Sequence, residues 1–531
     1  METVNKYKKF RTLASEYYIY LMFVVLPLVF IDHYFNISTE KWVFFTAATI
    51  LYIFVILTLL LVDSDPASSK WFDNMGVIEW CFVAFLLANG ISLVLSVDIT
   101  ESFLGLSSRH HGFANYALYF TVFFILRKQS IETNKFMRIF AFIGGFEGLF
   151  STLQFLTIDP IGMYNGTKWE SIMSFISTIG NANFFSSFLS LTTPLTIYLF
   201  IREKKPGMQM AYAVCMVLEF MGGLSCGADS FYLGIAAGLF IMLVGGGLTL
   251  RDYRRLPLAL MFVAAGDFVL ALVSNYLRDN RIVFSASLKY TSLGPTIVRA
   301  LEGITKALAD YTFLITFFVV MLVLYIVLLI VEKNIAKKRD TETTLDEVTP
   351  LPVGSKKGFR TFSNVVLVLS LVAIVCATIY IVVDYPFDDD FGTNRGFVWK
   401  LALDDFKGMS WFRKIFGYGQ ESLIIVFVNK YHDYMIESKR VIYDNVHCEP
   451  FQYLMTLGIL GLGTYIALIG STLSALIRKI RKDPEVNVFL IPIFSYFMQS
   501  FVNIAQTAST SLFFITIALA VNYLRRSANQ S

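Results

Sequence analysis

Long apolar runs constrain this sequence more than any other feature. A helix that crosses a bilayer needs about 20 mostly apolar residues. Fourteen runs reach or approach that length, near 17–35, 42–62, 77–97, 113–127, 136–157, 184–201, 208–225, 229–249, 256–276, 311–331, 363–383, 451–477, 487–504 and 507–524. The chain is 56% hydrophobic and 16% charged, which excludes an ordinary soluble enzyme. The sequence predicts an all-α integral membrane protein, a polytopic bundle of about fourteen transmembrane helices.

The distribution of basic residues predicts an orientation. If the N-terminus is cytoplasmic, the inner segments carry 28 of the 44 Lys and Arg residues. Most of the others lie in two long outer segments, 277–310 and 384–450, and long loops translocate largely regardless of charge. We therefore expect a multi-pass protein of the cell membrane with both termini in the cytoplasm.

The net charge and the cysteine pattern limit the kinds of partner and cofactor that the sequence predicts. A net charge of +4 is too small to indicate nucleic-acid binding. The five cysteines form no CxxC pair and no metal-ligand spacing, so we expect neither a metal site nor a cofactor. The bilayer itself is the one partner that composition indicates.

The runs divide the chain into three parts. The expected parts are a bundle of helices 1 to 11 over 1–383 with a cytoplasmic linker at 332–362, an external segment 384–450 before the twelfth helix, and helices 12 to 14 with a cytoplasmic tail over 451–531. No internal repeat is evident, although many transporters are built from repeated halves.

The external segment 384–450 is too long to be a simple tether between helices. Apolar residues between Phe397 and Met409 recur at near-helical spacing, which predicts an amphipathic helix at the outer surface. Gly417-Tyr418-Gly419 indicates a tight turn. A charged, aromatic, partly helical segment of this kind suits a site that handles a polar head group on a lipid tail.

His447 is the first candidate for chemistry in this segment. It lies just before Pro450, and proline favours the first turn of a helix, so His447 is expected near a helix N-terminus. The partial positive charge there favours a neutral imidazole, which can act as a general base. The alternative is an interfacial histidine that only caps or packs.

Two arginines are candidates for binding an anion. The guanidinium of Arg395 matches phosphate geometry, but the residue can also pair with the nearby aspartates 388–390. Arg109 is the only basic residue in a short outer loop, where basic residues are usually excluded. It is either functional or a cation that reaches the membrane interface.

Helix starts and intramembrane acids add further candidates. Asn181 and Asn183 open the sixth span, where exposed amides bind an anion or simply cap the helix. Glu147 and Asp267 lie deep enough in spans to be proton-coupled carboxylates of a transporter, or protonated structural groups. Asp229 lies near the outer end of the eighth span and can reach the external site.

Four of these segments together resemble the O-antigen ligase and O-antigen polymerase superfamily. His447-Cys448-Glu449 leading to Gly458 and Gly461 resembles the family signature of a His, usually Asn, Ser or Gln, nine residues, Gly, two residues and Gly. The other three matches are Arg395 and Trp399 before Gly417-Tyr418-Gly419-Gln420-Glu421, the external stretch 105–119 with Arg109 and Gly112, and the helix start 178–185. They occur in the family's order over about residues 105–461.

One departure from the family concerns Asp229. Aligning on Gly234 places Asp229 where members usually carry an arginine associated with the lipid-linked pyrophosphate. Arg109, Arg278, Arg281 or Arg299 can supply the missing charge; otherwise the donor or acceptor differs, or the chain is not an active transferase.

The resemblance implies a metal-independent, inverting glycosyltransferase of the large C-type membrane architecture. Such enzymes move a glycan from a polyprenyl-pyrophosphate donor to an acceptor hydroxyl on the outer face of the bacterial cytoplasmic membrane. The implied catalytic residues are His447, which takes the acceptor proton, and Arg395, which with Arg109 holds the pyrophosphate. Glu449 is expected to orient His447 or the acceptor, and Asp229, Asn181 and Asn183 to line the substrate site.

Two other functions stay open. A flippase or ion-coupled polysaccharide transporter fits the many spans and the intramembrane acids. A non-catalytic scaffold that binds lipid-linked sugars fits the unusual Asp229. Ligase and polymerase differ only in the acceptor, which is a different molecule or another lipid-linked glycan, and these residues do not separate them.

Overall fold

Long apolar helices dominate the computed structural model, which describes residues 2–33, 36–63, 72–165, 175–280, 282, 284, 310–337, 386–480 and 482–529, with isolated positions between 361 and 384. Every regular element in these ranges is a helix. Ten of the helices described are long and apolar enough to cross a membrane, and α6 and α10 are shorter apolar helices. The protein is thus a polytopic helical membrane protein.

The described helices occur in the following order along the chain. The first half contains α1 Glu2–Tyr20, a π-helical turn Leu21–Val25, α2 Leu26–Leu28, α3 Ile37–Leu61, α4 Val77–Val94, α5 Ile99–Leu104, α6 Phe113–Leu126, α7 Thr133–Phe155, α8 Ala182–Arg202, α9 Pro206–Cys226, α10 Asp229–Gly245 and α11 Leu250–Asp279. The second half contains α14 Tyr311–Lys337, α16 Phe391–Gly408, α17 Trp411–Phe416, α18 Leu423–Lys439, α19 Glu449–Lys479, a 3-10 turn Pro484–Val486, α20 Asn487–Gln499, a 3-10 turn Ser500–Val502 and α21 Thr507–Asn529.

Most of the predicted spans coincide with helices. The first predicted run, 17–35, only overlaps a helical stretch that runs from Glu2 through the π-helical turn to Leu28, and this stretch is not one of the ten helices that are apolar enough to cross a membrane. The run at 363–383 lies outside the described residues, as do most of 277–310 and 332–362. A total of fourteen spans therefore remains a prediction.

Helix α8 is the centre of the bundle. It is buried along its whole apolar length and contacts α7, α9, α10, α11, α20 and α21. Neighbouring helices approach closely where small residues meet. A Cβ on Gly222 of α9 would lie 2.7 Å from the Gly148 Cα of α7, so glycine sets the α7–α9 distance in the way typical of membrane helices.

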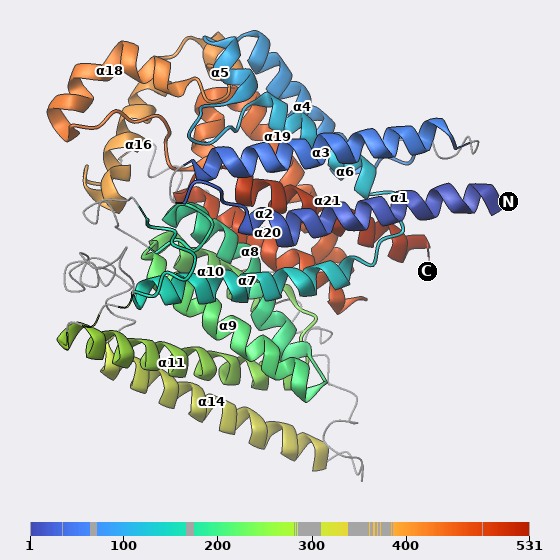
Figure 1. The fold of residues 1–531 in the computed structure, drawn as a ribbon, viewed down its shortest axis with the longest axis vertical. Coiled ribbons are helices and arrows are strands. Elements are labelled where there is room, and N and C mark those ends of the chain that lie inside the picture. The colour runs from blue at the N-terminus through green and yellow to red at the C-terminus, as the bar shows by residue number, and fades with distance from the viewer. Residues whose placement is uncertain are drawn as a thin grey trace.

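The two ends of the bundle differ. Both chain termini lie at one end, and the residues 386–448, which we call the cap, lie at the opposite end (Figure 1). Helix α14 lies at the edge of the bundle, packed on α11 (Figure 1).

The cap has a hydrophobic core of its own. The predicted amphipathic helix is present as α16, and it buries Phe397 and Val398 against Leu423 and Phe427 of α18. Its apolar face therefore packs inside the cap. Between the two helices, Lys430 Nζ donates to Asp405 Oδ1 at 2.7 Å.

Candidate functional site

The cap is joined to the bundle at a break in α19. Gly458 has a left-handed φ of 68°, which interrupts the helix. Just before the break, the carbonyls of Met455 and Thr456 accept hydrogen bonds from the backbone N–H groups of Tyr418 (3.1 Å) and Gly419 (2.8 Å). The predicted glycine turn is present as a bend at Tyr418 between two glycines of positive φ, and its N–H groups satisfy the carbonyls of a broken helix.

Glycine is required on both sides of this junction. A Cβ on Gly417, at φ 72°, would lie 2.2 Å from the Thr456 carbonyl. A Cβ on Gly458 would lie 2.2 Å from the Ile415 carbonyl oxygen. No side chain fits at such distances, and φ above zero already disfavours one. The junction explains in physical terms why glycines stand at these positions.

His447 lies two residues before α19, as predicted, on a segment without regular backbone pairing. The segment is held by side chains: Val446 N–H donates to Gln452 Oε1 at 3.1 Å, and Trp399 Nε1 donates to the Val446 carbonyl at 2.8 Å. His447 itself has a left-handed φ of 54°, and its N–H donates to Asn445 Oδ1 at 2.7 Å. The backbone of His447 is thereby fixed from α16, α19 and its own Asx turn.

The surroundings of His447 keep its imidazole neutral. The side chain is half-buried. Burial, together with the nearby cations Arg395 and Arg109, lowers the pKa of His447 to about 4, although Asp444 opposes the shift. A neutral imidazole near pH 7 can accept a proton from a hydroxyl.

Arg395 is incompletely paired. It follows a left-handed turn over Gly392, Thr393 and Asn394. Nη1 donates to the Gly392 carbonyl at 2.8 Å, and Nη2 makes a long 3.4 Å contact with Asn183 Oδ1. The buried Nε has no hydrogen-bond partner among the described residues. A buried cationic donor without an acceptor is costly, so this guanidinium is suited to an oxygen-rich anion.

The start of α8 supplies the neighbours of Arg395. Asn181 is the N-cap, with Oδ1 accepting from the Asn183 N–H at 2.8 Å. The Asn183 carbonyl accepts from Asn503 Nδ2 at 2.7 Å, which ties this helix start to the C-terminal helices. Asn183 thus joins the site through its side chain, and Asn181 shapes the helix start.

Asp229 is the exposed first residue of α10. It is near enough to Arg395 that its negative charge raises the pKa of that guanidinium, although burial lowers it more. Ser230, next to it, shares a 2.7 Å hydrogen bond with Ser186 of α8. Asp229 therefore lies close enough to Arg395 for the two charges to interact.

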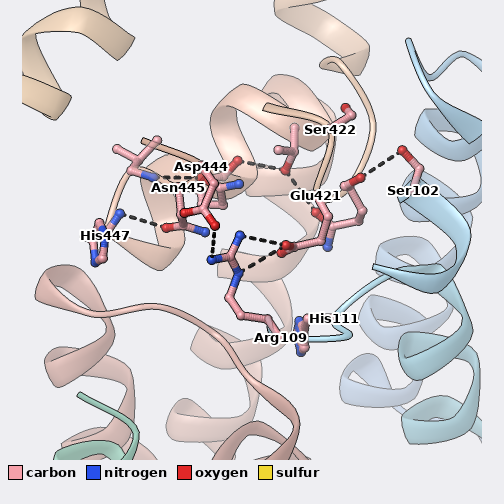
Figure 2. Close-up of polar contacts among 12 residues, drawn as sticks. Ser102, Arg109, His111, Glu421, Ser422, Asp444, Asn445 and His447 are labelled. Atoms are coloured by element: carbon pink, nitrogen blue, oxygen red, sulfur yellow. Dashed lines mark hydrogen bonds and ion pairs between the residues drawn. The ribbon is translucent and has the colours of Figure 1, made fainter. Parts of the chain in front are cut away.

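Arg109, in contrast, is fully engaged. Its Nε and Nη2 donate to Glu421 Oε2 at 3.1 and 3.0 Å, and Nη1 donates to Asp444 Oδ2 at 2.9 Å. Figure 2 shows the guanidinium between the two carboxylates, with His447 on the far side of Asp444 and Asn445. Arg109 is 4% exposed, so it is buried beneath the cap.

Glu449 lies near His447 in sequence but its carboxylate points elsewhere. Oε1 accepts from Tyr453 at 2.9 Å and from Tyr465 at 3.1 Å, inside the bundle. Tyr453 also shares a 2.8 Å hydrogen bond with Tyr116. The contacts of Glu449 are therefore with buried tyrosines, not with His447, which differs from the orienting role expected for it.

Sequence reasoning gave no role to Asp444, Asn445 or Gln452. Asn445 stands two residues before His447, the spacing of an Asx turn, and that signal was available. Of the arginines proposed to replace the missing family charge, Arg281 and Arg299 lie outside the described residues, as does the side chain of Arg278.

No protein-family model matches this chain, and no curated protein matches it. Among the described residues, no group of three or more His, Cys, Asp and Glu side chains is arranged to hold a metal ion. The geometry of His447 and Arg395 is therefore the main basis for a function.

Proposed function

We propose that this protein is a membrane glycosyltransferase of the O-antigen ligase or polymerase type. It transfers a glycan from a polyprenyl-pyrophosphate donor to an acceptor hydroxyl, with inversion and without a metal. The observation that carries the proposal is that a half-buried His447, whose pKa burial and Arg395 lower, lies near a guanidinium whose buried Nε lacks an acceptor in the described part of the chain.

The proposed reaction is a single displacement. The acceptor hydroxyl oxygen attacks the anomeric carbon and gives its proton to His447. The bond between that carbon and the pyrophosphate oxygen breaks on the opposite face, which inverts the configuration. Arg395 stabilises the negative charge that develops on the leaving oxygen.

The proposed orientation has both termini in the cytoplasm and the cap at the outer face of a bacterial cell membrane. It is supported by the bias of 28 of the 44 basic residues toward the inner segments. The termini and the cap lie at opposite ends of the bundle (Figure 1), as this orientation requires.

Transfer by the purified protein in nanodiscs tests the proposal. The donor is a pool of polyprenyl-pyrophosphate oligosaccharides, assayed with EDTA present. His447→Ala is expected to reduce transfer by about 10²- to 10⁴-fold, the usual contribution of a general base. Arg440→Gln, an exposed residue of the cap, is the matched control.

The products also separate the subclasses. Longer lipid-linked glycans indicate a polymerase, and glycan on a different added acceptor indicates a ligase. Wild-type activity in the His447→Ala variant at equal expression would contradict the base assignment.

A transporter is the second candidate, and Asp267 is the observation that favours it. This residue is buried in the span α11, and its Oδ1 has no hydrogen-bond partner among the described residues. Movement of lipid-linked glycan across vesicles, driven by a proton gradient and lost in Asp267→Asn but kept in His447→Ala, would favour transport over transfer.

A further inference from the structure

The backbone of Arg109 is fixed by the bundle. Its loop is closed where Gly105 and Gly112 meet, because a Cβ on Gly112 would lie 2.5 Å from the Gly105 nitrogen. Thr507 of α21 donates to the Arg109 carbonyl at 3.4 Å, and Thr507 also accepts from Asn115 of α6 at 3.0 Å. Contacts with α6 and α21 therefore hold in place the loop that carries Arg109.

The Arg109 guanidinium links the segments at both ends of α18 to this loop. Glu421 lies two residues before the first residue of α18, and Asp444 lies five residues after its last. Arg109 donates to both carboxylates (Figure 2). One buried cation thus holds together the two ends of the cap segment that begins at Glu421 and ends at Asp444.

The contact between Arg109 and Asp444 also affects the turn that carries His447. Asp444 is followed by Asn445, whose side chain accepts from the His447 N–H at 2.7 Å. His447 has a left-handed φ, a conformation that persists only when its surroundings hold it. Fixing Asp444 therefore fixes the start of the turn that carries the imidazole.

Donor phosphates cannot reach Arg109 without displacing these carboxylates. The Arg109–Glu421 pair is nearly inaccessible, with side-chain exposures of 4% and 6%. Separating a buried ion pair is unfavourable because it leaves an uncompensated charge in the interior. Phosphate binding to Arg109 would thus require Glu421 and Asp444 of the cap to move away from it.

We propose that Arg109 is a positioning residue that holds the turn bearing His447, and that it does not contact the donor phosphates. This inference rests on the proposed transferase function. It assigns different tasks to the two arginines: Arg395 binds the leaving group, and Arg109 sets the location of the base.

The kinetic test compares Arg109→Gln and Arg109→Lys with Arg395→Gln. In Arg109→Gln the turn that bears His447 is held less firmly, so kcat is expected to fall by about 10- to 100-fold, with the donor KM unchanged. Arg109→Lys keeps the charge but not the fork, so we expect partial rescue. Arg395→Gln is expected to raise the donor KM.

Arg440→Gln again serves as the control, and thermal unfolding of each variant excludes loss of fold. If Arg109→Gln does not fold, Glu421→Gln and Asp444→Asn weaken the same contact while retaining the arginine. A rise in donor KM in the Arg109 or carboxylate variants equal to that in Arg395→Gln, with kcat unchanged, would overturn the inference.

A second measurement does not depend on transfer. The rate at which diethyl pyrocarbonate modifies His447, followed by mass spectrometry against pH, reports the pKa of the imidazole. Removing the Arg109 charge and leaving Asp444 unpaired is expected to raise that pKa. An unchanged pKa in Arg109→Gln overturns the inference, whereas a wild-type protein that transfers no glycan overturns the proposed function.

Discussion

Two arginines at the same end of the molecule have opposite surroundings. Arg109 has a carboxylate on each side and is almost inaccessible. Arg395 has a backbone carbonyl, a distant amide and a buried Nε with no acceptor in the described structure. An arginine whose hydrogen bonds are satisfied stabilises the protein itself, whereas one that lacks an acceptor is available to a ligand.

The first way to test this comparison is stability. Arg109→Met leaves Glu421 buried without its cation, and we expect the free energy of unfolding to fall by about 3–5 kcal/mol. The lower end is expected because the Asp444 side chain is 31% exposed. Arg395→Met is expected to cost about 1 kcal/mol or less, the scale of ordinary hydrogen bonds. Thermal unfolding in detergent measures both, and equal losses would contradict the comparison.

The second test is donor use. Arg395→Gln removes the cation that we propose stabilises the leaving group, so kcat/KM is expected to fall by about 10²- to 10³-fold. Asp229→Asn removes a negative charge beside the same guanidinium, and the donor KM is expected to fall by about two- to fivefold. Initial rates at varied donor concentration measure both effects. A higher KM in Asp229→Asn would instead indicate that the carboxylate binds a sugar hydroxyl.

The third test is pH dependence. A general base works in its neutral form, so activity is lost as pH falls through the pKa of His447, which burial and Arg395 lower to about 4. We expect transfer to be insensitive to the protonation of His447 between about pH 6 and 8. In Arg395→Gln the lost cation raises that pKa, so the acid limb moves to higher pH. A pH–rate profile with an unmoved limb would place Arg395 away from the base.

The smallest effect is expected for Glu449→Gln. The glutamine retains an acceptor for Tyr453 and Tyr465, and the carboxylate makes its hydrogen bonds away from His447. Transfer is expected to stay within about threefold of wild type, the effect of one modest hydrogen bond. A loss as large as that of His447→Ala would show that Glu449 acts on the site after all.

Local patterns predicted the parts of the fold that depend on short stretches of chain. Apolar runs located the helices because a bilayer-crossing helix needs length and composition alone. The N-cap Asn181 and the start of α19 after His447 also follow from neighbouring residues. The glycines at 417 and 458 were visible as a pattern, but their reason, the contact between the cap link and the broken α19, was not.

The sequence by itself determined that this is a polytopic helical membrane protein and which polar residues gather in its longest polar segment. Only the tertiary structure decided that Arg109 is paired with carboxylates and that Arg395 has a buried donor without an acceptor in the described part of the chain. Arg109 and Glu421 are 312 residues apart, and Arg395 and Asn183 are 212 apart. The physical reason is that the availability of a charge depends on its burial and on the acceptors around it, and contacts between distant segments set both.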